Sequence, residues 1–413
     1  MKKVYIGIDA HKESNLVALA FDGRGDPELY GKAPSDIPGF IKVLRRIMEK
    51  HHLLKEEIAL CYEAGPTGFV LARRLRALGF ECEVVAPSLI PTRASDRVKT
   101  DRRDARKLAG LYRAGQLTYV HIPDATDEVI RDVCRARTDA VEIQSRGRQQ
   151  LSALLLRNGL QYKGVSTWTE AHLRYLRELP MQDAAQKIVL EEYLQRIDSA
   201  VAQVERFEQH MEALLKDWSR RSFVEALQGF RGFQLVTSMV ITSELGDLMR
   251  FQHPRQLMAY LGLVPSEQSS GGKRHQGAIT KSGNSHARWM LIEAAQSYRL
   301  PPKVSREISL RQEGLGREVK AVSWRAQNRL HRRYSRLLMR GIHRNKVVVA
   351  VARELCGFIW ELARVVYGPS GASTAPTPEL PTAAVRPPTS RGVAHSRSQA
   401  AAMDNPSLAI PAG

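Results

Sequence analysis

The chain has 413 residues and 43% hydrophobic content, enough for two or three domains with cores of their own, which excludes an intrinsically disordered protein. Its 62 Lys and Arg against 43 Asp and Glu give a formal charge of +19, which favours a polyanionic partner such as nucleic acid. No apolar run is long enough to span a bilayer, and Met1-Lys2-Lys3 leads straight into an expected strand, so we expect a cytoplasmic protein with no membrane partner.

The first 90 residues alternate between apolar strand patterns and helical patterns. The expected order is strand 4–8, strand 16–21, helix 37–51, strand 58–62, helix 67–78 and strand 82–85, which predicts a layered α/β sheet. Asp9 follows the first strand, and Glu63 follows the strand at 58–62. Open α/β sheets place their chemistry at such strand ends, although a solvated acid is the more common explanation for either residue alone.

The segment from Lys99 to Leu108 supplies two more acids. Thr100 is a good helix N-cap, so Asp101 and Asp104 should share one face of a first helical turn. A surface ion pair between Asp104 and Lys107 is the simpler explanation for this segment by itself. Four carboxylates converging from three segments instead predict a metal site for Mg²⁺, with Mn²⁺ as the alternative ion.

Two long helices are expected after Thr126. Their seams, which repeat in steps of three and four, are Val129, Val133, Ala136, Ala140, Ile143, Gly147, Gln150 and Leu154, then Leu190, Leu194, Ile197, Val201, Val204, Glu208, Met211, Leu215 and Trp218. A loop at 158–169 and a short helix near 172–179 should join them. Such seams fit an antiparallel hairpin within one chain or pairing with another copy, and the sequence does not choose between the two.

The region after Ser222 combines glycine turns with basic helices. The Gly-x-x-Gly turn from Gly229 to Gly232 can offer backbone N–H groups to a phosphate, although such turns more often only connect helices. Residues 301–350 carry thirteen Lys or Arg against three Glu, with Trp324 and Tyr334 among them. This composition predicts a nucleic-acid surface that includes Arg332 and Arg333. A final apolar helix is expected at 347–367.

The stretch from Gly262 to Arg288 contains a second candidate for chemistry. Ser269 and Ser270 precede two glycines, and nearby Lys273, Arg274, Lys281 and Arg288 could hold a phosphate. A serine beside flexible backbone and cations can be a nucleophile, with His275 as a candidate base, but a Ser-Gly-Gly segment is more often a simple turn. The four cysteines, Cys61, Cys82, Cys134 and Cys356, lack metal-site spacing, so we expect reduced core side chains.

Several segments together resemble the DEDD transposases of the insertion-sequence 110 family. Residues 6–12, 62–68 and 99–105 resemble the RuvC-like domain of that family, and residues 262–265, 270–272 and 280–284 resemble its second block. The resemblance implies metal binding by Asp9, Glu63, Asp101 and Asp104, and nucleophilic attack by Ser270, with Ser269 as a near neighbour. It implies an RNase H-like (RuvC-like) α/β domain at 1–124, a helical coiled-coil segment at 125–221 and a helical transposase domain at 222–367. The remaining residues, 368–413, are rich in Pro, Ala, Ser and Thr, and this composition predicts a disordered tail.

The resemblance also implies the activity. Family members exchange strands between donor and target DNA, and some are guided by a structured RNA from their own element. We therefore expect a Mg²⁺-dependent DNA transposase that forms a serine-linked DNA intermediate and works as a homo-dimer or tetramer, with a guide RNA as a further partner. Two alternatives stay open at this point: a junction-resolving nuclease that uses metal-activated water, and a non-catalytic nucleic-acid-binding protein.

Overall fold

The computed structural model describes residues 2–92, 100–181, 183–270 and 273–368, and the side chains of 268–274 are not among the described features. The chain divides into Met1–Ser373 and Thr374–Gly413. Apart from Gly368, the tail that was predicted to be disordered lies outside the described residues.

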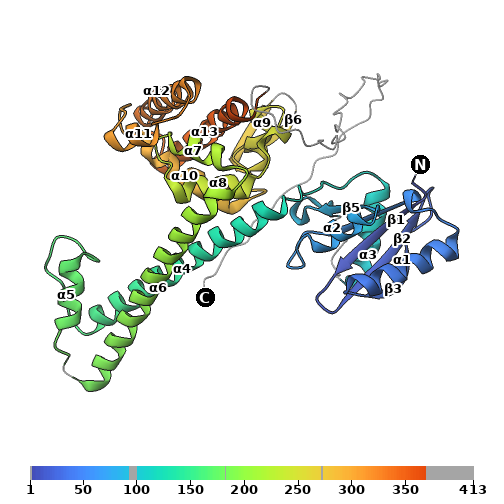
Figure 1. Ribbon diagram of the computed structural model, residues 1–413, viewed down its shortest axis with the longest axis horizontal. Helices are drawn as coiled ribbons and strands as arrows, with labels where there is room; N and C mark the ends of the chain where they lie inside the picture. Colours follow the sequence, from blue (N-terminus) through green and yellow to red (C-terminus); the bar gives the residue numbers. More distant parts are fainter. Residues whose placement is uncertain (1, 93–99, 182, 271–272, 369–413) are drawn as a thin grey trace, which may run out of the picture. The chain divides into compact units, whose positions relative to one another are not determined.

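The N-terminal region contains a five-stranded mixed sheet (Figure 1). The strands are β1 (Val4–Ala10), β2 (Ser14–Phe21), β3 (Glu28–Pro34), β4 (Ile58–Glu63) and β5 (Glu81–Val85), in the order β3-β2-β1-β4-β5. β1 pairs antiparallel with β2 and parallel with β4, while β2–β3 is antiparallel and β4–β5 parallel. The four predicted strands are confirmed. β3 was not predicted, because this edge strand lacks an apolar run and is interrupted by Gly31.

Helices cover both faces of this sheet. The core under α1 (Ile37–His51) and α2 (Val70–Ala77) contains Ile6 and Ile8 from β1 and Leu60 from β4. The opposite face packs against α3 (Asp101–Arg113), where Cys61 of β4 meets Leu108. Single 3-10 turns lie at η1 (Lys55–Glu57) and η2 (Pro87–Leu89). The predicted helices are confirmed, with α2 beginning three residues later than expected.

Gly7 allows α3 to lie directly on the sheet. A Cβ atom at this position would lie 2.4 Å from the backbone O of Ala105 and 2.4 Å from the backbone N of Ala109. Contacts that short are not sustained by real side chains, so only glycine permits this approach. The close packing brings the first turn of α3 to the carboxyl end of β1.

The two predicted long helices form an antiparallel hairpin within one chain. α4 (Ala125–Arg157) and α6 (Ala184–Asp217) are joined through α5 (Glu170–Glu178). Arg137 of α4 pairs with Glu208 of α6 at 2.6 Å, so the polar interruption of the predicted seam carries an ion pair. Across the hairpin, Gly147 packs against Ile197.

The predicted seam of α6 agrees with the structure better than that of α4. The predicted seam residues Leu190, Leu194, Ile197 and Met211 are buried on α6, and Ala140, Gly147 and Leu154 are buried on α4. Val129 and Ile143 are exposed instead, and their predicted place in the seam is wrong. Ile130, one residue after Val129, and Leu151, one residue after the predicted seam residue Gln150, are buried instead.

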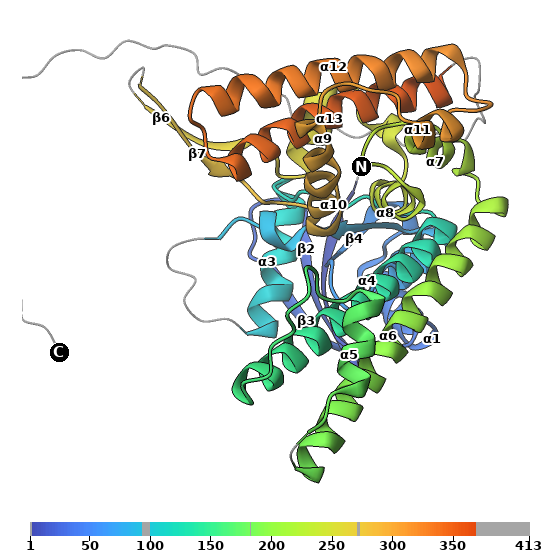
Figure 2. The same cartoon turned by 90° about the vertical axis from the view of Figure 1, so that its left-hand side faces the viewer.

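The C-terminal part of the described chain is mostly helical. Its elements are α7 (Arg221–Gln228), α8 (Leu235–Leu245), η3 (Leu248–Arg250), α9 (Pro254–Tyr260), β6 (Pro265–Ser270), β7 (Lys273–Ile279), α10 (Ser285–Ala295), η4 (Gln296–Arg299), α11 (Arg306–Arg311), α12 (Arg317–Met339) and α13 (Arg344–Tyr367). α12 and α13 lie side by side, with the β6–β7 hairpin beside them (Figure 2). Within the described residues, no helix is both long and apolar enough to cross a bilayer.

The Gly229–Gly232 turn packs into the core of this region. Its Phe230 and Phe233 side chains are fully buried. The backbone N–H groups of Gly229 and Phe230 donate to the carbonyls of Ala226 and Leu227. These two donors are used at the end of α7, which favours the connecting-turn interpretation. The four cysteines are free and buried, as expected.

Candidate active site

Two of the predicted acids meet at the carboxyl end of the sheet. Carboxylate oxygens of Asp9 and Asp101 and a ring nitrogen of His11 all lie within 4.8 Å of one another, a spacing that suits a single metal ion. His11 Nε2 lies 3.1 Å from an Asp9 oxygen and 3.7 Å from an Asp101 oxygen. Asp9 is 20% exposed and Asp101 70% exposed, so the cluster is open to solvent on the α3 side.

Strand register brings the third acid to the same edge. Ile8 of β1 pairs with Tyr62 of the parallel β4, so Asp9 and Glu63 come next along neighbouring strands. The alternation of β4 buries Tyr62 on the α1–α2 face and Cys61 on the α3 face, which puts Glu63 on the α3 face. Asp104 lies one turn along α3 from Asp101.

Several charged side chains around Asp9 affect its pKa. Partial burial raises the pKa of Asp9, His11 lowers it, and the neighbouring carboxylates of Asp101 and Asp104 raise it further. A bound divalent cation would relieve this repulsion, and carboxylate oxygens are the donors that Mg²⁺ and Mn²⁺ prefer. The residues present therefore fit a divalent ion.

The predicted four-acid set is assembled only in part. Asp9 and Asp101 share the 4.8 Å cluster, whereas Glu63 and Asp104 lie outside it. His11 is the member that sequence reasoning missed. The signal that could have found it is its position two residues after Asp9, near the end of the same strand, where a side chain can reach the same edge.

The segment that carries the candidate nucleophile is a β-hairpin. Ser270 is the last residue of β6 and pairs with Lys273 of β7, and Ser269 pairs with Arg274. The sequence analysis did not predict these two strands. The side chains of Ser269, Ser270, Lys273 and Arg274 lie outside the described features, so their predicted roles stay predictions.

The base of this hairpin is fixed to the helices around it. A Cβ atom at Gly283 would lie 1.9 Å from the backbone O of Tyr260, so that turn tolerates only glycine. Arg288 donates from Nη1 to the carbonyls of Leu261, at 3.0 Å, and Ser282, at 2.9 Å. Arg288 was predicted to hold phosphate, but this nitrogen ties the two ends of the hairpin together. Lys281, by contrast, is exposed.

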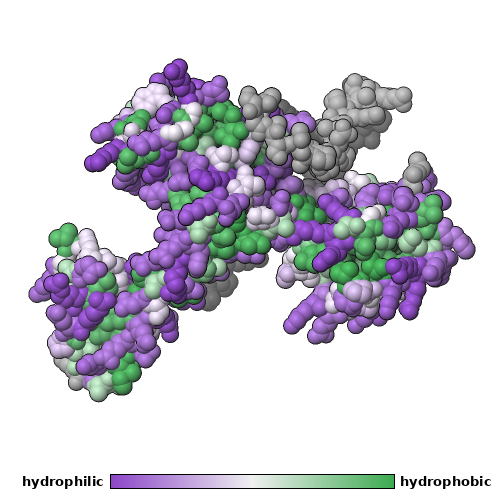
Figure 3. All heavy atoms as spheres, viewed as in Figure 1, coloured by the Kyte–Doolittle hydropathy of each residue, from purple (hydrophilic) through white to green (hydrophobic). Residues whose placement is uncertain are grey.

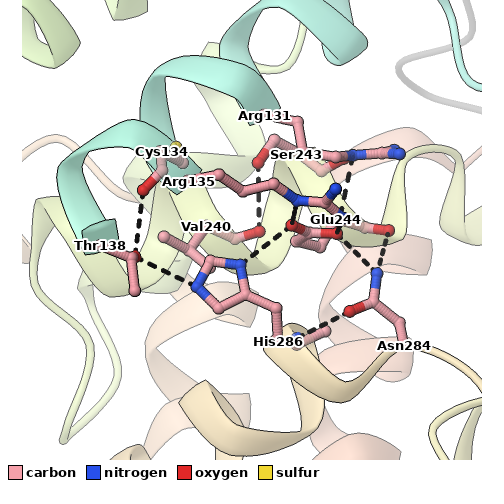
Figure 4. Close-up of polar contacts among 10 residues, drawn as sticks. Arg131, Cys134, Arg135, Thr138, Val240, Ser243, Glu244, Asn284 and His286 are labelled. Atoms are coloured by element: carbon pink, nitrogen blue, oxygen red, sulfur yellow. Dashed lines mark hydrogen bonds and ion pairs between the residues drawn. The ribbon is translucent and has the colours of Figure 1, made fainter. Parts of the chain in front are cut away.

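A buried carboxylate connects the long helix α4 to the residues that follow the hairpin (Figure 4). The Glu244 side chain is 0% exposed. Arg135 donates to both of its oxygens, at 2.8 and 3.0 Å, and Asn284 donates at 2.6 Å. His286 Nδ1 lies 3.0 Å from Glu244. Burial raises the pKa of Glu244, but hydrogen bonds from His286, Arg135 and Asn284 outweigh it and lower the pKa to about 2.

The basic helix α12 presents arginines and one aromatic side chain at the surface. Arg332 and Arg333 line a cavity of about 630 Å³ with Trp324, and Arg333 also pairs with Glu354 of α13 at 3.1 Å. Trp324 is 46% exposed, as a base-stacking residue requires. Tyr334 is only 5% exposed, so its predicted place on this surface is wrong. Hydrophilic and hydrophobic side chains both lie over this region (Figure 3).

The comparisons with known proteins agree on the family to which this chain is similar. The family described as "Transposase IS116/IS110/IS902 family" matches residues 224–307, and the DEDD transposase family of IS110 elements matches residues 6–158. The protein y4qE of Sinorhizobium fredii, named as a transposase, is 42% identical over 88% of this chain and 89% of its own length. The transposase of insertion sequence element IS1533 from Leptospira borgpetersenii is 29% identical over 81% of this chain and 97% of its own length. The chain belongs to the IS116/IS110/IS902 family of insertion-sequence transposases, which are DNA-processing enzymes.

Proposed function

We propose that this transposase cleaves and rejoins DNA strands with a divalent cation, Mg²⁺ or Mn²⁺, held by Asp9, Glu63, Asp101 and Asp104, and with Ser270 as the nucleophile. The observation that carries the proposal is the meeting of Asp9 and Asp101, which are 92 residues apart in the chain, within 4.8 Å. The strand order β3-β2-β1-β4-β5 supports an RNase H-like fold for this part of the chain. We assign it to residues 1–124, the helical coiled-coil segment to 125–221 and the transposase domain to 222–367.

The acids act by holding charge at one place. Asp9 is fixed by β1, and Asp101 by the helix that packs on Gly7, so both carboxylates are held by rigid elements. When bound, a divalent cation would neutralise charge on the oxygens of the reacting phosphate. The His11 ring N–H donates to the Asp9 carboxylate at 3.1 Å and holds it in orientation. Glu63 and Asp104 reach the cluster through side-chain rotation from positions on the same face.

The serine step can be written so that its atoms balance. Ser270 Oγ attacks the phosphorus of a DNA phosphodiester, and the bond from phosphorus to one deoxyribose oxygen breaks. The serine proton leaves, and the departing oxygen takes up a proton to become a free DNA hydroxyl. A hydroxyl from another DNA strand then attacks the serine–phosphate ester, which restores serine and joins the new strand.

The partners follow from the same proposal. Lys273, Arg274, Lys281, Arg332 and Arg333 are assigned to nucleic-acid binding, supported by the exposure of Lys281 and Arg332. A structured RNA encoded by the element is the proposed guide, and a homo-dimer or tetramer is the proposed assembly. An oligomer would let the serine of one copy meet the acids of another.

The test is the appearance of protein-linked DNA. The purified full chain is incubated with element-end DNA, Mg²⁺ and its co-purifying RNA, and the products are separated on a denaturing gel. Wild type should give a protein–DNA adduct, Ser270→Ala should give none, and Ser269→Ala is the matched control that should keep the adduct. An adduct that persists in Ser270→Ala contradicts the nucleophile assignment. Free hydrolysed ends without any adduct would instead support the junction-nuclease alternative.

A further inference from the structure

A large groove lies beside the β6–β7 hairpin, between α9, α12 and α13. Its volume is about 1120 Å³, slightly above the roughly 300–1,000 Å³ of small-molecule pockets. Gln276, Gly277, Ala278 and Ile279 of β7 form one wall, and the first half of α13 forms the opposite wall. We call this feature the hairpin groove.

The floor of the hairpin groove is apolar. It is formed by Met258, Leu263, Pro265, Ile279, Val349 and Ala350. All of them except the buried Leu263 are partly exposed, so apolar surface faces the open side. A ligand that covers this floor gains from burying apolar surface of its own.

The rim is strongly cationic. Among the described lining residues, Glu354 is the one acid, and the cations are Arg255, Lys281, Arg329, Arg333, Lys346 and Arg353. Glu354 is already paired with Arg329 at 3.0 Å and with Arg333 at 3.1 Å. Arg255, Lys281, Lys346 and Arg353 form no ion pair with any acid in the described part of the chain. Their charge is therefore available to an anionic ligand.

A second cavity continues the groove along α12. The cavity of about 630 Å³ shares Arg329, Arg333 and Glu354 with the hairpin groove and is lined further by Trp324, Arg325, Arg332 and Arg336. The two cavities therefore adjoin at these three residues, and the second one reaches the exposed Trp324 ring. The lining on α12 runs from Trp324 to Arg336, about 18 Å at 1.5 Å per residue, which is long enough for a strand of several nucleotides.

Cations above an apolar floor fit a single nucleic-acid strand. A duplex presents phosphates outward and keeps the faces of its bases stacked inside, so an apolar floor gains little from it. A single strand offers phosphates to the rim and unstacked base faces to the floor and to Trp324. The charge and the apolar surface therefore favour the same occupant.

We propose that the hairpin groove holds the single DNA strand next to the phosphate that the hairpin attacks. This rests on the proposed role of Ser270. Gln276, which lines the groove, lies three residues along β7 from Lys273, the strand partner of Ser270. At about 3.3 Å per residue, the groove begins roughly 10 Å from the level of Ser270. A strand bound there would lie along β7, which pairs with β6 up to Ser270.

The binding test uses the full chain as the Ser270→Ala variant without added metal, so that no chemistry is required. A fluorescent single-stranded DNA of the element end is titrated, alongside the same sequence as a duplex and as RNA. The groove variant is Lys346→Ala/Arg353→Ala. Its matched control, Lys42→Ala/Arg46→Ala, removes one Lys and one Arg from the exposed face of α1.

The expected result is preferential binding of single-stranded DNA that depends on the groove. The groove variant should bind it about tenfold more weakly, a loss of about 1.4 kcal/mol. Its plot of log affinity against log salt should become shallower by about 1.4, since each single-strand phosphate contact contributes about 0.7. The α1 control should match the parent. Equal binding by the groove variant and the control overturns the proposal, and so does preference for the duplex or for RNA.

The apolar floor has its own test. Ala350→Glu introduces a negative charge on the helical wall of the groove, and Ala350→Gln introduces nearly the same volume without the charge. Binding should fall in Ala350→Glu and stay closer to the parent in Ala350→Gln, while both should keep the parent circular dichroism spectrum. Equal binding by the two variants overturns the assignment of this wall to the strand.

The binding experiment and the adduct assay test the two proposals independently. If wild type forms the Ser270 adduct while groove variants bind normally, the groove proposal fails and the proposed function stands. If the groove binds the strand but Ser270→Ala still forms the adduct, the proposed function fails at Ser270, and with it the placement of the strand beside that residue.

Discussion

Two carboxylates on core elements of this transposase have opposite surroundings. Asp9 is 20% exposed; its partial burial raises its pKa, His11 lowers it, and the nearby acids Asp101 and Asp104 raise it further. Glu244 is fully buried, yet Arg135, Asn284 and His286 satisfy it and lower its pKa to about 2. The first arrangement leaves negative charge uncompensated and suits a cation, whereas the second is complete and suits a structural role. Burial of an acid therefore says less about function than the charges around it.

The largest expected effect is at Asp9, where a substitution should abolish activity but leave stability intact. Asp9→Asn should abolish strand cleavage, because it removes a central ligand of the proposed ion. The melting temperature should stay the same or rise slightly, because the change also removes repulsion from Asp101 and Asp104. Cleavage of element-end DNA and thermal denaturation measure the two effects. A large drop in melting temperature would mean that Asp9 is structural, like Glu244.

Glu244→Ala should show the reverse pattern. It leaves Arg131, which is 14% exposed, and Arg135 without their carboxylate, and Asn284 without its acceptor. Breaking such a buried network costs about 3–5 kcal/mol of folding free energy. Urea denaturation measures the loss. The control Glu225→Ala breaks the exposed pair with Arg221 and should cost about 0.5 kcal/mol or less. Equal losses in the two variants would contradict the comparison.

Gly7→Ala should displace α3 and with it one residue of the acid cluster. The added Cβ would lie 2.4 Å from the backbone of α3, so the helix must move away from β1 and carry Asp101 with it. Overpacking of this kind costs about 1–3 kcal/mol, and cleavage should fall further than stability alone explains. Gly25→Ala is the control, because a Cβ there meets nothing within 4 Å. Full cleavage activity in a folded Gly7→Ala protein would show that the approach of α3 is not needed.

The pH dependence of stability should reveal Glu244 by its sign. Its folded pKa of about 2 lies below its ordinary value of 4.5, so its ionised form stabilises the folded state above about pH 4.5. That contribution should disappear progressively as the pH falls from about 4.5 toward 2. Melting temperatures of wild type and Glu244→Gln should therefore converge on acidification. A constant difference across this pH range would contradict the lowered pKa.

The sequence predicted the regular elements well and the tertiary partnerships less well. Apolar runs located β1 and β4, and the N-cap residue Thr100 located α3, and with them the edge where Asp9 and Asp101 meet. It did not locate the β6–β7 hairpin, because the glycines and polar residues of that segment are equally typical of a loop. Hairpin pairing depends on contacts that composition does not encode.

The sequence also did not predict the surroundings of several individual side chains. Arg288 and Tyr334 look like surface residues by type, yet Arg288 ties backbone carbonyls together and Tyr334 is buried. Glu244 sits in an apolar helix and gives no sign in the sequence of the partners it finds on α4 and α10. The hairpin groove likewise combines residues from five elements that no local pattern connects.

The most direct measurement of the central claim is a Mn²⁺ titration of the full chain, followed by electron paramagnetic resonance. Wild type, Asp101→Asn and Glu244→Gln are compared under identical conditions without DNA. The account predicts one saturable Mn²⁺ site in wild type and in Glu244→Gln, and a marked weakening of that site in Asp101→Asn. Binding by Asp101→Asn that equals wild type, or a site that is lost only in Glu244→Gln, would contradict it.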